Sequence, residues 1–343
     1  MHYSYINSVR GIAILMVIMC HVAYKFEIHN NNLEWLLGYG RMGVQLFFIA
    51  SAYTLCLSAE QRQGEKNSIY RFYVRRYFRI FPVYYFGIVL YFLVRLYFND
   101  FDNFTFINIT INLLFLQGLA PSVNNSIVPG GWSIGIEMLF YSIFPFLFIF
   151  LNKGNGLLKG FILIVINSII FYFIQDLFAL DFDFLNLNIL NNLPVFIVGM
   201  LFYRYRKSAI FSKKILQIMC FLSFTFLSYL CYLCKDVLVI DGNPQYFKFI
   251  NLFSGVSFIF LFVLVEKSKF LNNLIFQQLG VNSYSMYILH FLPLWVIPTL
   301  KNELVIFPLF LFITIVTYLL SIPSVRFIET PFIKLGKKII NRI

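Results

Sequence analysis

The stretch from Trp132 to Leu151 reads WSIGIEMLFYSIFPFLFIFL, twenty consecutive residues with a single charged side chain, Glu137. A transmembrane helix needs about 20 predominantly apolar residues to cross a bilayer. Of the 343 residues in the chain, 60% are hydrophobic and 12% are charged, about half the charged fraction of soluble proteins. So few charges cannot coat a water-soluble globule, and the sequence therefore predicts an all-α, polytopic integral membrane bundle.

Eleven apolar stretches are bounded by polar residues, and we expect ten of them to cross the membrane. The exception is the polar-interrupted stretch 104–119, which is expected to re-enter the membrane or to lie at its interface. With ten crossings the basic segments, including 62–79 and 334–342, all face one side, as the positive-inside rule requires. The sequence predicts a single integral membrane domain over 1–343, with both termini in the cytoplasm and a vestibule near 104–131 on the outer face.

The formal net charge of +12 arises from 27 Lys and Arg residues against 15 Asp and Glu residues. Because the basic residues gather in short segments between apolar stretches, they indicate topology, and no nucleic-acid partner is expected. Cys231 and Cys234 have a C-x-x-C spacing, but no second pair or nearby His accompanies them. No metal site is therefore expected.

Arg10 and His21 are two polar side chains in the first apolar stretch, eleven residues apart. On an α-helix this spacing gives about 16 Å of rise and about 1100° of turn, so both side chains project to nearly the same face. Ionisable groups within membrane spans are expensive and indicate function. The alternatives are that Arg10 snorkels to the interface as a topology anchor, and that His21 is a hydrogen-bonded structural histidine.

A cluster of arginines lies in the segment Tyr73–Tyr84, where the inner loop meets the third span. Arg71, Arg75 and Arg79 recur every four residues and would share a helical face, with Arg76 offset by about 100°. Guanidinium groups bind phosphates bidentately, so a cytoplasmic phosphate-bearing donor such as a nucleotide or coenzyme A would fit. The alternative is a topology signal that also contacts anionic lipid.

Ser133, Glu137 and Tyr141 are spaced four residues apart, and Ser133 comes directly after Trp132 at the outer start of a later span. Glu137 lies about a turn and a half inside the expected boundary, at a depth where a carboxylate needs a partner or a proton. At that depth it would reach His21 and could orient the imidazole as a base. A purely structural ion pair or hydrogen bond is the alternative.

Later spans add His290, at the end of Ser283–His290, and the pair Arg326 and Glu329. His290 is expected near the middle of the membrane, where a structural role is an alternative to a substrate contact. Arg326 and Glu329 are three residues apart and could pair with each other on one helical face. Arg41 and Gln45 in the second span are weaker candidates for lining the cavity.

In their order and spacing these segments resemble the membrane-bound acyltransferase-3 family. The matching segments are Arg10–His21, Gly43–Tyr53, Arg75–Tyr84, Gly131–Tyr141, Ser283–His290 and Glu329–Pro331. One departure is Ala52, where the family usually has Gly after Ser, and this change is expected to alter helix packing more than chemistry. The resemblance implies an acyl-CoA-dependent O-acyltransferase that binds no cofactor and moves an acyl group, commonly acetyl, from the cytoplasm to hydroxyls of extracytoplasmic glycans. The acceptor would be a polysaccharide, O-antigen, capsule or lipid-linked sugar.

The resemblance also implies roles for individual residues. His21 matches the family's proposed catalytic histidine and Arg10 the arginine paired with it, whereas Glu137 matches the acidic position of a tryptophan-serine motif. The donor-side and substrate-binding set comprises Arg75, Arg76, Arg79, Tyr84, Trp132, Ser133, Tyr141 and His290. Arg10, Trp132 or Ser133 could stabilise the tetrahedral oxyanion.

Nothing in the chain resembles the extra extracellular domain that some members of the family carry. The chain is therefore expected to present the acceptor at its own vestibule or to pass the acyl group to another glycan-assembly protein. The expected location is the lipid bilayer of a bacterial plasma (inner) membrane. The main rival is a transporter or flippase, in which buried Arg, Glu and His residues form a substrate or proton path.

Overall fold

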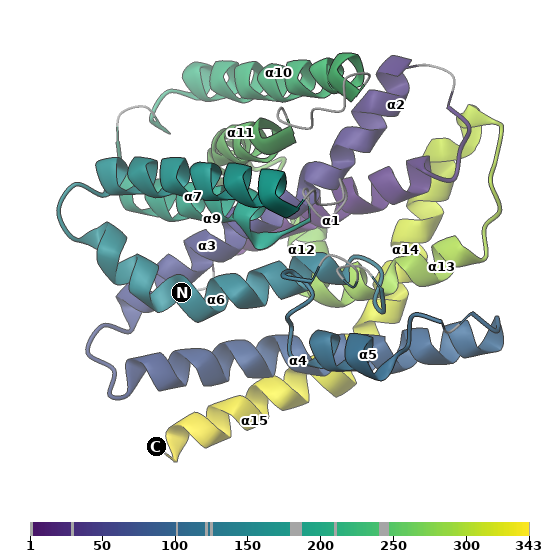
Figure 1. The fold of residues 1–343 in the computed structure, drawn as a ribbon, viewed down its shortest axis with the longest axis horizontal. Helices are drawn as coiled ribbons and strands as arrows, with labels where there is room; N and C mark the ends of the chain where they lie inside the picture. The colour runs from purple at the N-terminus through teal and green to yellow at the C-terminus, as the bar shows by residue number, and fades with distance from the viewer. Residues whose placement is uncertain are drawn as a thin grey trace.

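The regular structure of the chain is helical throughout the part that the structure describes. The computed structural model describes residues 3–28, 31–100, 102–120, 123, 126–178, 187–208, 211–239 and 247–342. Within these ranges the one pairing of extended backbone is a bridge between Phe26 and Leu300. The predicted all-α class is therefore confirmed (Figure 1).

The helices are named in chain order. They are α1 (Ser4–Ala23), α2 (Asn31–Gly38), η1 (Tyr39–Met42), α3 (Gly43–Gln61), α4 (Ser68–Tyr97), α5 (Phe106–Leu113), α6 (Gly131–Asn152), α7 (Gly156–Phe178), α9 (Ile189–Tyr205), α10 (Lys214–Val239), α11 (Phe247–Lys267), α12 (Leu274–Leu289), α13 (Phe291–Trp295), η5 (Glu303–Val305), α14 (Ile306–Ser324), the π-helix η6 (Val325–Glu329) and α15 (Thr330–Asn341).

Seven helical segments in the described residues are long and apolar enough to cross a membrane. Helices at the periphery expose large apolar side chains, such as Phe161 and Phe173 on α7, as expected of a surface that faces lipid. The chain is a multi-pass membrane protein. The predicted total of ten crossings stays a prediction.

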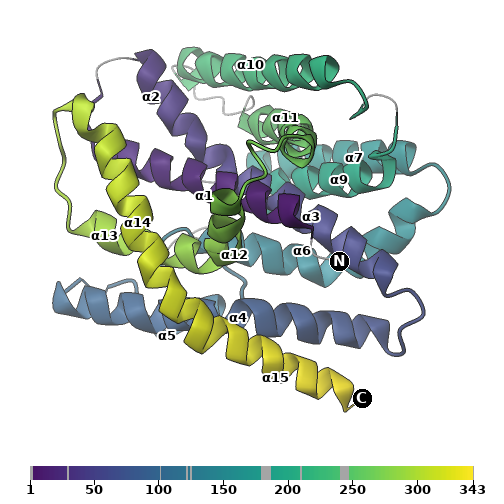
Figure 2. The same ribbon diagram turned by 180° about the vertical axis from the view of Figure 1, so that it is seen from behind.

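The start of α1, the start of α4 and the end of α15 lie at the same end of the bundle (Figures 1 and 2). This end, called the inner end here, carries the arginine cluster of α4. The opposite end, where α1 finishes, is called the outer end. The first and last helices thus place their ends of the chain at one end of the bundle, and the cytoplasmic location of the termini stays a prediction.

Two glycines bring α1 and α12 into close contact. A Cβ added at Gly11 would overlap the carbonyl oxygen of Phe276, and one added at Gly280 would overlap the carbonyl oxygen of Asn7. Small residues at such positions let two membrane helices approach backbone to backbone. Both helices run from the inner to the outer end, so this contact also fixes the distance between their outer ends.

The segment 104–119 does not cross the membrane. Its helix α5 has eight residues, or about 12 Å of rise, against a hydrocarbon core of about 30 Å. The chain after α5 instead enters the bundle, where Ile127 and Val128 are fully buried. The buried Gln117 donates from Nε2 to the hydroxyl of Tyr84 (2.9 Å) and to the carbonyl of Gly131 (3.0 Å). Helix α6 therefore begins inside the bundle.

Ala52, the departure from the family pattern, packs where α3 crosses α9. A Cβ added at Gly199 would lie 2.9 Å from the Cβ of Ala52, so the glycine on α9 provides the room that the methyl group on α3 occupies. The consequence of the substitution is one of helix packing.

Candidate functional site

The first element of the site is a cavity between α1, α3, α4, α6 and α12, called the inner cavity here. Six of the residues predicted from the sequence line it: Arg10, Arg76, Arg79, Ser133, Glu137 and Tyr141. Ser51, Tyr284 and Tyr287 also line it and were not singled out from the sequence. Five helices that are far apart in the chain thus contribute to one polar chamber.

The inner cavity carries a net positive charge, because its lining holds three guanidinium groups and one carboxylate. Arg10 donates from Nη2 to Oγ1 of Thr54 at 3.2 Å. Arg76 lies over the rings of Phe72 and Tyr141, with its Cζ 5.9 and 5.8 Å from their centroids. Its buried Nε has no hydrogen-bond partner within the described residues. A buried donor without a partner is costly, which favours a ligand that brings an acceptor into this cavity.

Glu137 binds hydroxyl groups in the inner cavity, and the contacts of the described residues do not join it to His21. Ser51 donates from Oγ to Oε1 of Glu137 at 2.5 Å, and the hydroxyl of Tyr141 donates to the same oxygen. The prediction that Glu137 lies at the level of His21 assumed that α6 starts at the outer surface. Because the re-entrant chain places the start of α6 inside the bundle, Glu137 faces the cavity that Arg10 lines.

A second cavity, called the basic cavity here, lies between the start of α4 and α15. Its charged lining consists of Arg62, Arg71, Arg75, Arg76, Arg79, Lys337 and Glu65. Six cations against one carboxylate give a net charge of +5. Arg76 and Arg79 line both cavities, so the two chambers adjoin along one side of α4.

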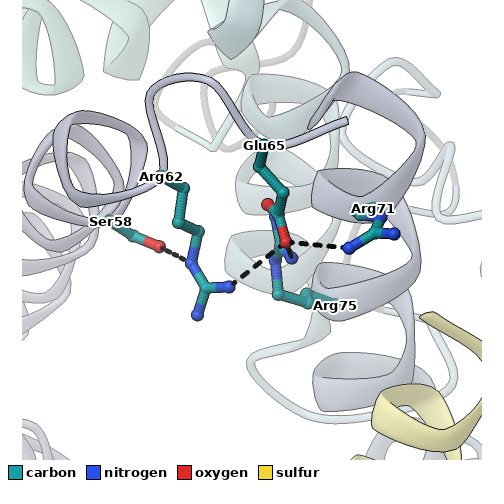
Figure 3. Close-up of polar contacts among 5 residues, drawn as sticks. All are labelled: Ser58, Arg62, Glu65, Arg71 and Arg75. Atoms are coloured by element: carbon teal, nitrogen blue, oxygen red, sulfur yellow. Dashed lines mark hydrogen bonds and ion pairs between the residues drawn. The ribbon is translucent and has the colours of Figure 1, made fainter. Parts of the chain in front are cut away.

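Glu65, in the loop between α3 and α4, holds the arginines at the mouth of the basic cavity (Figure 3). Its two carboxylate oxygens receive Nη1 and Nη2 of Arg75 at 3.1 and 2.9 Å, and Arg71 approaches Oε1 at 3.4 Å. The hydrogen bond from Arg75 lowers the pKa of the Glu65 carboxyl below its usual range. Two guanidinium groups that bind one carboxylate could bind the oxygen atoms of a phosphate in the same way.

A pair of imidazoles lies where α1 and α12 meet at the outer end. Nδ1 of His21 lies 2.9 Å from the carbonyl oxygen of Val17 and 3.2 Å from Nε2 of His290. Nδ1 of His290 lies 2.7 Å from the carbonyl oxygen of Tyr287. His290 is fully buried, whereas His21 is half-buried. The second imidazole adjoins the first, and its predicted contact with substrate stays a prediction.

These contacts indicate which ring nitrogen of each imidazole carries the proton when the ring holds only one. A carbonyl oxygen only accepts hydrogen bonds, so the proton lies on Nδ1 in both His21 and His290. The single Nδ1 proton of His21 is then shared between the carbonyl oxygen of Val17 and Nε2 of His290, and the lone pair of His21 lies on Nε2. An imidazole held in this way has one nitrogen anchored and the other available to take a proton.

The family model described as an acyltransferase domain matches residues 3–326, nearly the whole chain. The chain belongs to the acyltransferase-3 family. The resemblance drawn from the sequence motifs is therefore confirmed, and acyl transfer is the chemistry of the family to which this membrane protein belongs.

Relatives of this acyltransferase-3 protein occur in bacteria and in a virus. The O-acetyltransferase OatA of Staphylococcus aureus (strain NCTC 8325 / PS 47) is 23% identical, over 97% of this chain and 57% of its own length. The peptidoglycan O-acetyltransferase OatA of Listeria monocytogenes is 27% identical, over 43% of this chain and 24% of its own length. ORF330 of Acidianus two-tailed virus, whose name proposes an acetyltransferase, is 24% identical, over 84% of this chain and 82% of its own length. No solved structure matches the chain significantly.

The remaining predicted residues of the acyltransferase lie outside the inner cavity. Tyr84 donates from its hydroxyl to Asn112 at 2.7 Å and so anchors the re-entrant chain. Trp132 packs edge-to-face on Phe48, with centroids 6.5 Å apart, and lines neither cavity. Arg75 lines the basic cavity and binds Glu65. Some residues of the predicted binding set thus line a cavity and others make contacts within the bundle, and their binding roles stay predictions.

Tyr287 connects the inner cavity to the histidine pair. Its ring lines the cavity and lies 5.7 Å from the ring of His290, centroid to centroid. Its hydroxyl accepts from Oγ of Ser133 at 2.8 Å and donates to the carbonyl of Gly130 at 3.0 Å. The end of the cavity formed by Ser133 and Tyr287 is therefore the end next to the histidines.

Two other predictions concern groups away from the cavities. Glu329 lies in the π-helix η6 and accepts from Ser285 at 3.3 Å, and the described contacts do not join it to Arg326. A π-helix has more residues per turn than an α-helix, so positions three apart no longer share a face. Among the described side chains no group of three or more His, Cys, Asp or Glu could hold a metal ion, and the side chains of Cys231 and Cys234 lie outside that set.

Proposed function

We propose that this protein is an acyl-CoA-dependent O-acyltransferase that moves an acetyl group to a hydroxyl of an extracytoplasmic glycan or lipid-linked sugar. The observation that carries the proposal is the double role of Arg76 and Arg79, which line both the basic cavity and the inner cavity. A donor with a phosphate-rich end and a long polar arm needs two such chambers in series. The names of the OatA relatives support acetyl as the group transferred.

The basic cavity supplies the binding chemistry for the nucleotide end of coenzyme A. Its net charge of +5 attracts phosphates, and guanidinium groups bind them bidentately. Binding would replace the Glu65 carboxylate on Arg75 with a phosphate oxygen. The pantetheine arm would then pass Arg76 and Arg79 into the inner cavity, where amide and carbonyl groups can accept from Arg10.

The histidine pair supplies the base. Nε2 of His21 removes the proton of the acceptor hydroxyl while its oxygen attacks the thioester carbon. The new carbon–oxygen bond gives a tetrahedral oxyanion; the carbon–sulfur bond breaks as this oxyanion collapses, and the proton passes from His21 to the departing thiolate. His290 accepts from Nδ1 of His21 and stabilises the imidazolium that forms.

Arg10 belongs to the donor path in this mechanism. About 16 Å of helix rise separates it from His21, whereas an oxyanion donor must lie within about 3 Å of the developing charge. Of the three predicted oxyanion donors, Ser133 lies at the end of the inner cavity next to the histidines. We assign oxyanion stabilisation to the Ser133 end and arm binding to Arg10.

We place this reaction in the plasma membrane of a bacterium, with acyl-CoA inside and a surface glycan outside. The lipid bilayer and other glycan-assembly proteins are its further partners, and the chain acts as one integral membrane domain.

The test is acyl transfer by the purified full chain in proteoliposomes. Acetyl-CoA labelled in the acetyl group is supplied with soluble peptidoglycan oligosaccharides, and free thiol and alkali-labile label on the glycan are measured. Equal amounts of thiol and glycan ester are expected. A transporter or flippase would leave the thioester intact, and that result would reject the proposal.

A further inference from the structure

A third pocket lies at the outer end of the bundle, away from both arginine-lined cavities. This outer pocket is lined by residues of α2, η1, α10 and α11 and by Tyr24 at the end of α1. Its lining includes Tyr24, Glu34, Trp35, Tyr39, Arg41 and Ser228. The mechanism described above uses none of these residues.

The outer pocket adjoins the base of the proposed reaction. Tyr24 lines the pocket, and its ring lies 5.9 Å from the ring of His21 in an edge-to-face contact. Cys20, the neighbour of His21, contacts the carbonyl of Gly38 in the pocket wall through Sγ at 3.5 Å. A molecule held in the pocket is thus one side chain away from the half-buried imidazole.

The walls of the outer pocket are held in place by packing. The ring of Trp35 lies 4.1 Å from that of Tyr229 on α10 and 5.5 Å from that of Tyr39, centroid to centroid. The hydroxyl of Tyr39 bonds to Oγ of Ser254 at 3.1 Å. Close contact of η1 with α1 adds to this rigidity, because a Cβ added at Gly40 would overlap the carbonyl oxygen of Met16. The pocket is therefore preformed.

The chemistry of the lining identifies the class of ligand. Flat aromatic faces pack against the C–H faces of a sugar ring, and carboxylate and guanidinium groups accept from and donate to its hydroxyls. Glu34 and Arg41 together give the pocket no net charge, so it does not select for a phosphate.

We infer that the outer pocket is the acceptor subsite, which binds one pyranose residue of a glycan through Trp35, Glu34 and Arg41 and presents a hydroxyl to His21. This inference rests on the proposed function and names the place where its acceptor binds. The sugar could belong to a soluble polysaccharide or to a lipid-linked precursor, since the recognised ring is the same.

The experiment measures steady-state kinetics of the full chain in proteoliposomes with two acceptors in separate arms. One arm uses soluble peptidoglycan oligosaccharides and the other a polyprenyl-linked disaccharide in the same membrane. Trp35→Ala is expected to raise the acceptor KM about tenfold, equivalent to about 1.4 kcal/mol of binding, with the donor KM unchanged. Trp35→Phe should restore most of the affinity, and Glu34→Gln should raise the acceptor KM by a smaller factor. The arm that saturates identifies the source of the sugar.

Trp295→Ala is the matched control, because Trp295 also lies at the outer end but packs on Tyr91 and lines no part of the pocket. Its acceptor KM should equal that of the unmodified chain. Unchanged acceptor KM in both Trp35→Ala and Glu34→Gln, with the unmodified chain active, would overturn the inference and leave the proposed function standing.

If the unmodified chain transfers acetyl to neither acceptor, the proposed function has failed instead. Equilibrium binding of tritiated oligosaccharide without donor then tests the pocket directly. Binding that is lost in Trp35→Ala and kept in Trp295→Ala supports the subsite, whereas equal binding by both variants overturns it.

Discussion

Arg10 and His21 project from nearly the same face of α1, yet their surroundings are different. Arg10 lines a charged chamber with two further arginines and Glu137. His21 contacts a second imidazole and the rings of Tyr24 and Phe291. The inner half of the helix is thus suited to holding an anionic, polar molecule, and the outer half to moving a proton. The two ends of this face of α1 are thus expected to have different roles. Substitutions at the outer end should change kcat, and substitutions at the inner end should change the donor KM.

The largest expected effect comes from removing the outer base. His21→Ala should lower kcat about 100- to 10,000-fold, because a positioned general base contributes about that much, with donor binding unchanged. The measurement is acetyl transfer by purified protein at matched abundance. Full activity in this variant would show that His21 is not the general base, and it would contradict the separate roles proposed for the two ends of α1.

A smaller loss is expected when the positioning residue behind the base is removed. His290→Ala removes the second imidazole and leaves the carbonyl oxygen of Val17 as the acceptor for Nδ1 of His21, and it should lower kcat about 10- to 100-fold without changing the donor KM. His290→Gln offers a side-chain carbonyl to the same nitrogen and should recover part of the rate. If the two variants are equally impaired and equally destabilised, His290 acts only through packing.

At the inner end, the donor KM is the constant that should change. Arg79→Ala removes a guanidinium shared by both cavities and should raise the KM for acetyl-CoA about tenfold, the value of one charge-assisted hydrogen bond, while kcat at saturation changes little. The control is Arg95→Ala, on the same helix but at the outer end, where Arg95 pairs with Asp100. A fall in kcat with an unchanged donor KM would contradict the separation of the two halves.

The smallest effect has the opposite sign. Glu65→Gln frees Arg75 and should lower the donor KM about two- to fivefold, as expected for loss of a partly exposed ion pair that competes with phosphate. Glu60→Gln changes the same charge at an exposed position outside both cavities and should have no effect. A donor KM that rises in Glu65→Gln would show that the carboxylate organises the site.

The pH dependence of this ion pair follows from the lowered pKa of Glu65. Its stabilising contribution is fully present above the ordinary carboxyl range and is lost as the pH falls through the lowered value. Near neutral pH the carboxylate therefore stays charged, and the difference between Glu65→Gln and the unmodified chain should not vary with pH there.

The sequence predicted the helical membrane fold and six of the residues that line the inner cavity, because charged groups in apolar runs are few and stand out. It predicted that 104–119 does not cross, because polar residues interrupt that stretch. It did not predict how far the following chain enters the bundle, since the apolar pattern looks the same for a buried re-entrant segment and a surface loop with apolar residues. The wrong depth of Glu137 follows from that omission.

Other contacts depend on which helices are neighbours, and a single chain does not encode this in its periodicity. His290 and His21 are far apart in sequence and meet because Gly11 and Gly280 bring α1 and α12 together. Ser51 is a small polar residue in an apolar run, a common feature of membrane helices. Glu65 carried a usable signal, since it is an acidic residue inside a basic segment.

The position of Arg76 and Arg79 between the two cavities has a consequence for the permeability barrier of the cell. Any passage wide enough for a thioester arm threatens to leak protons and sodium ions when no arm fills it. Two fixed positive charges at the junction repel cations, as an arginine does in water-selective pores. The residues that would guide the donor across would thus also keep the membrane electrically sealed.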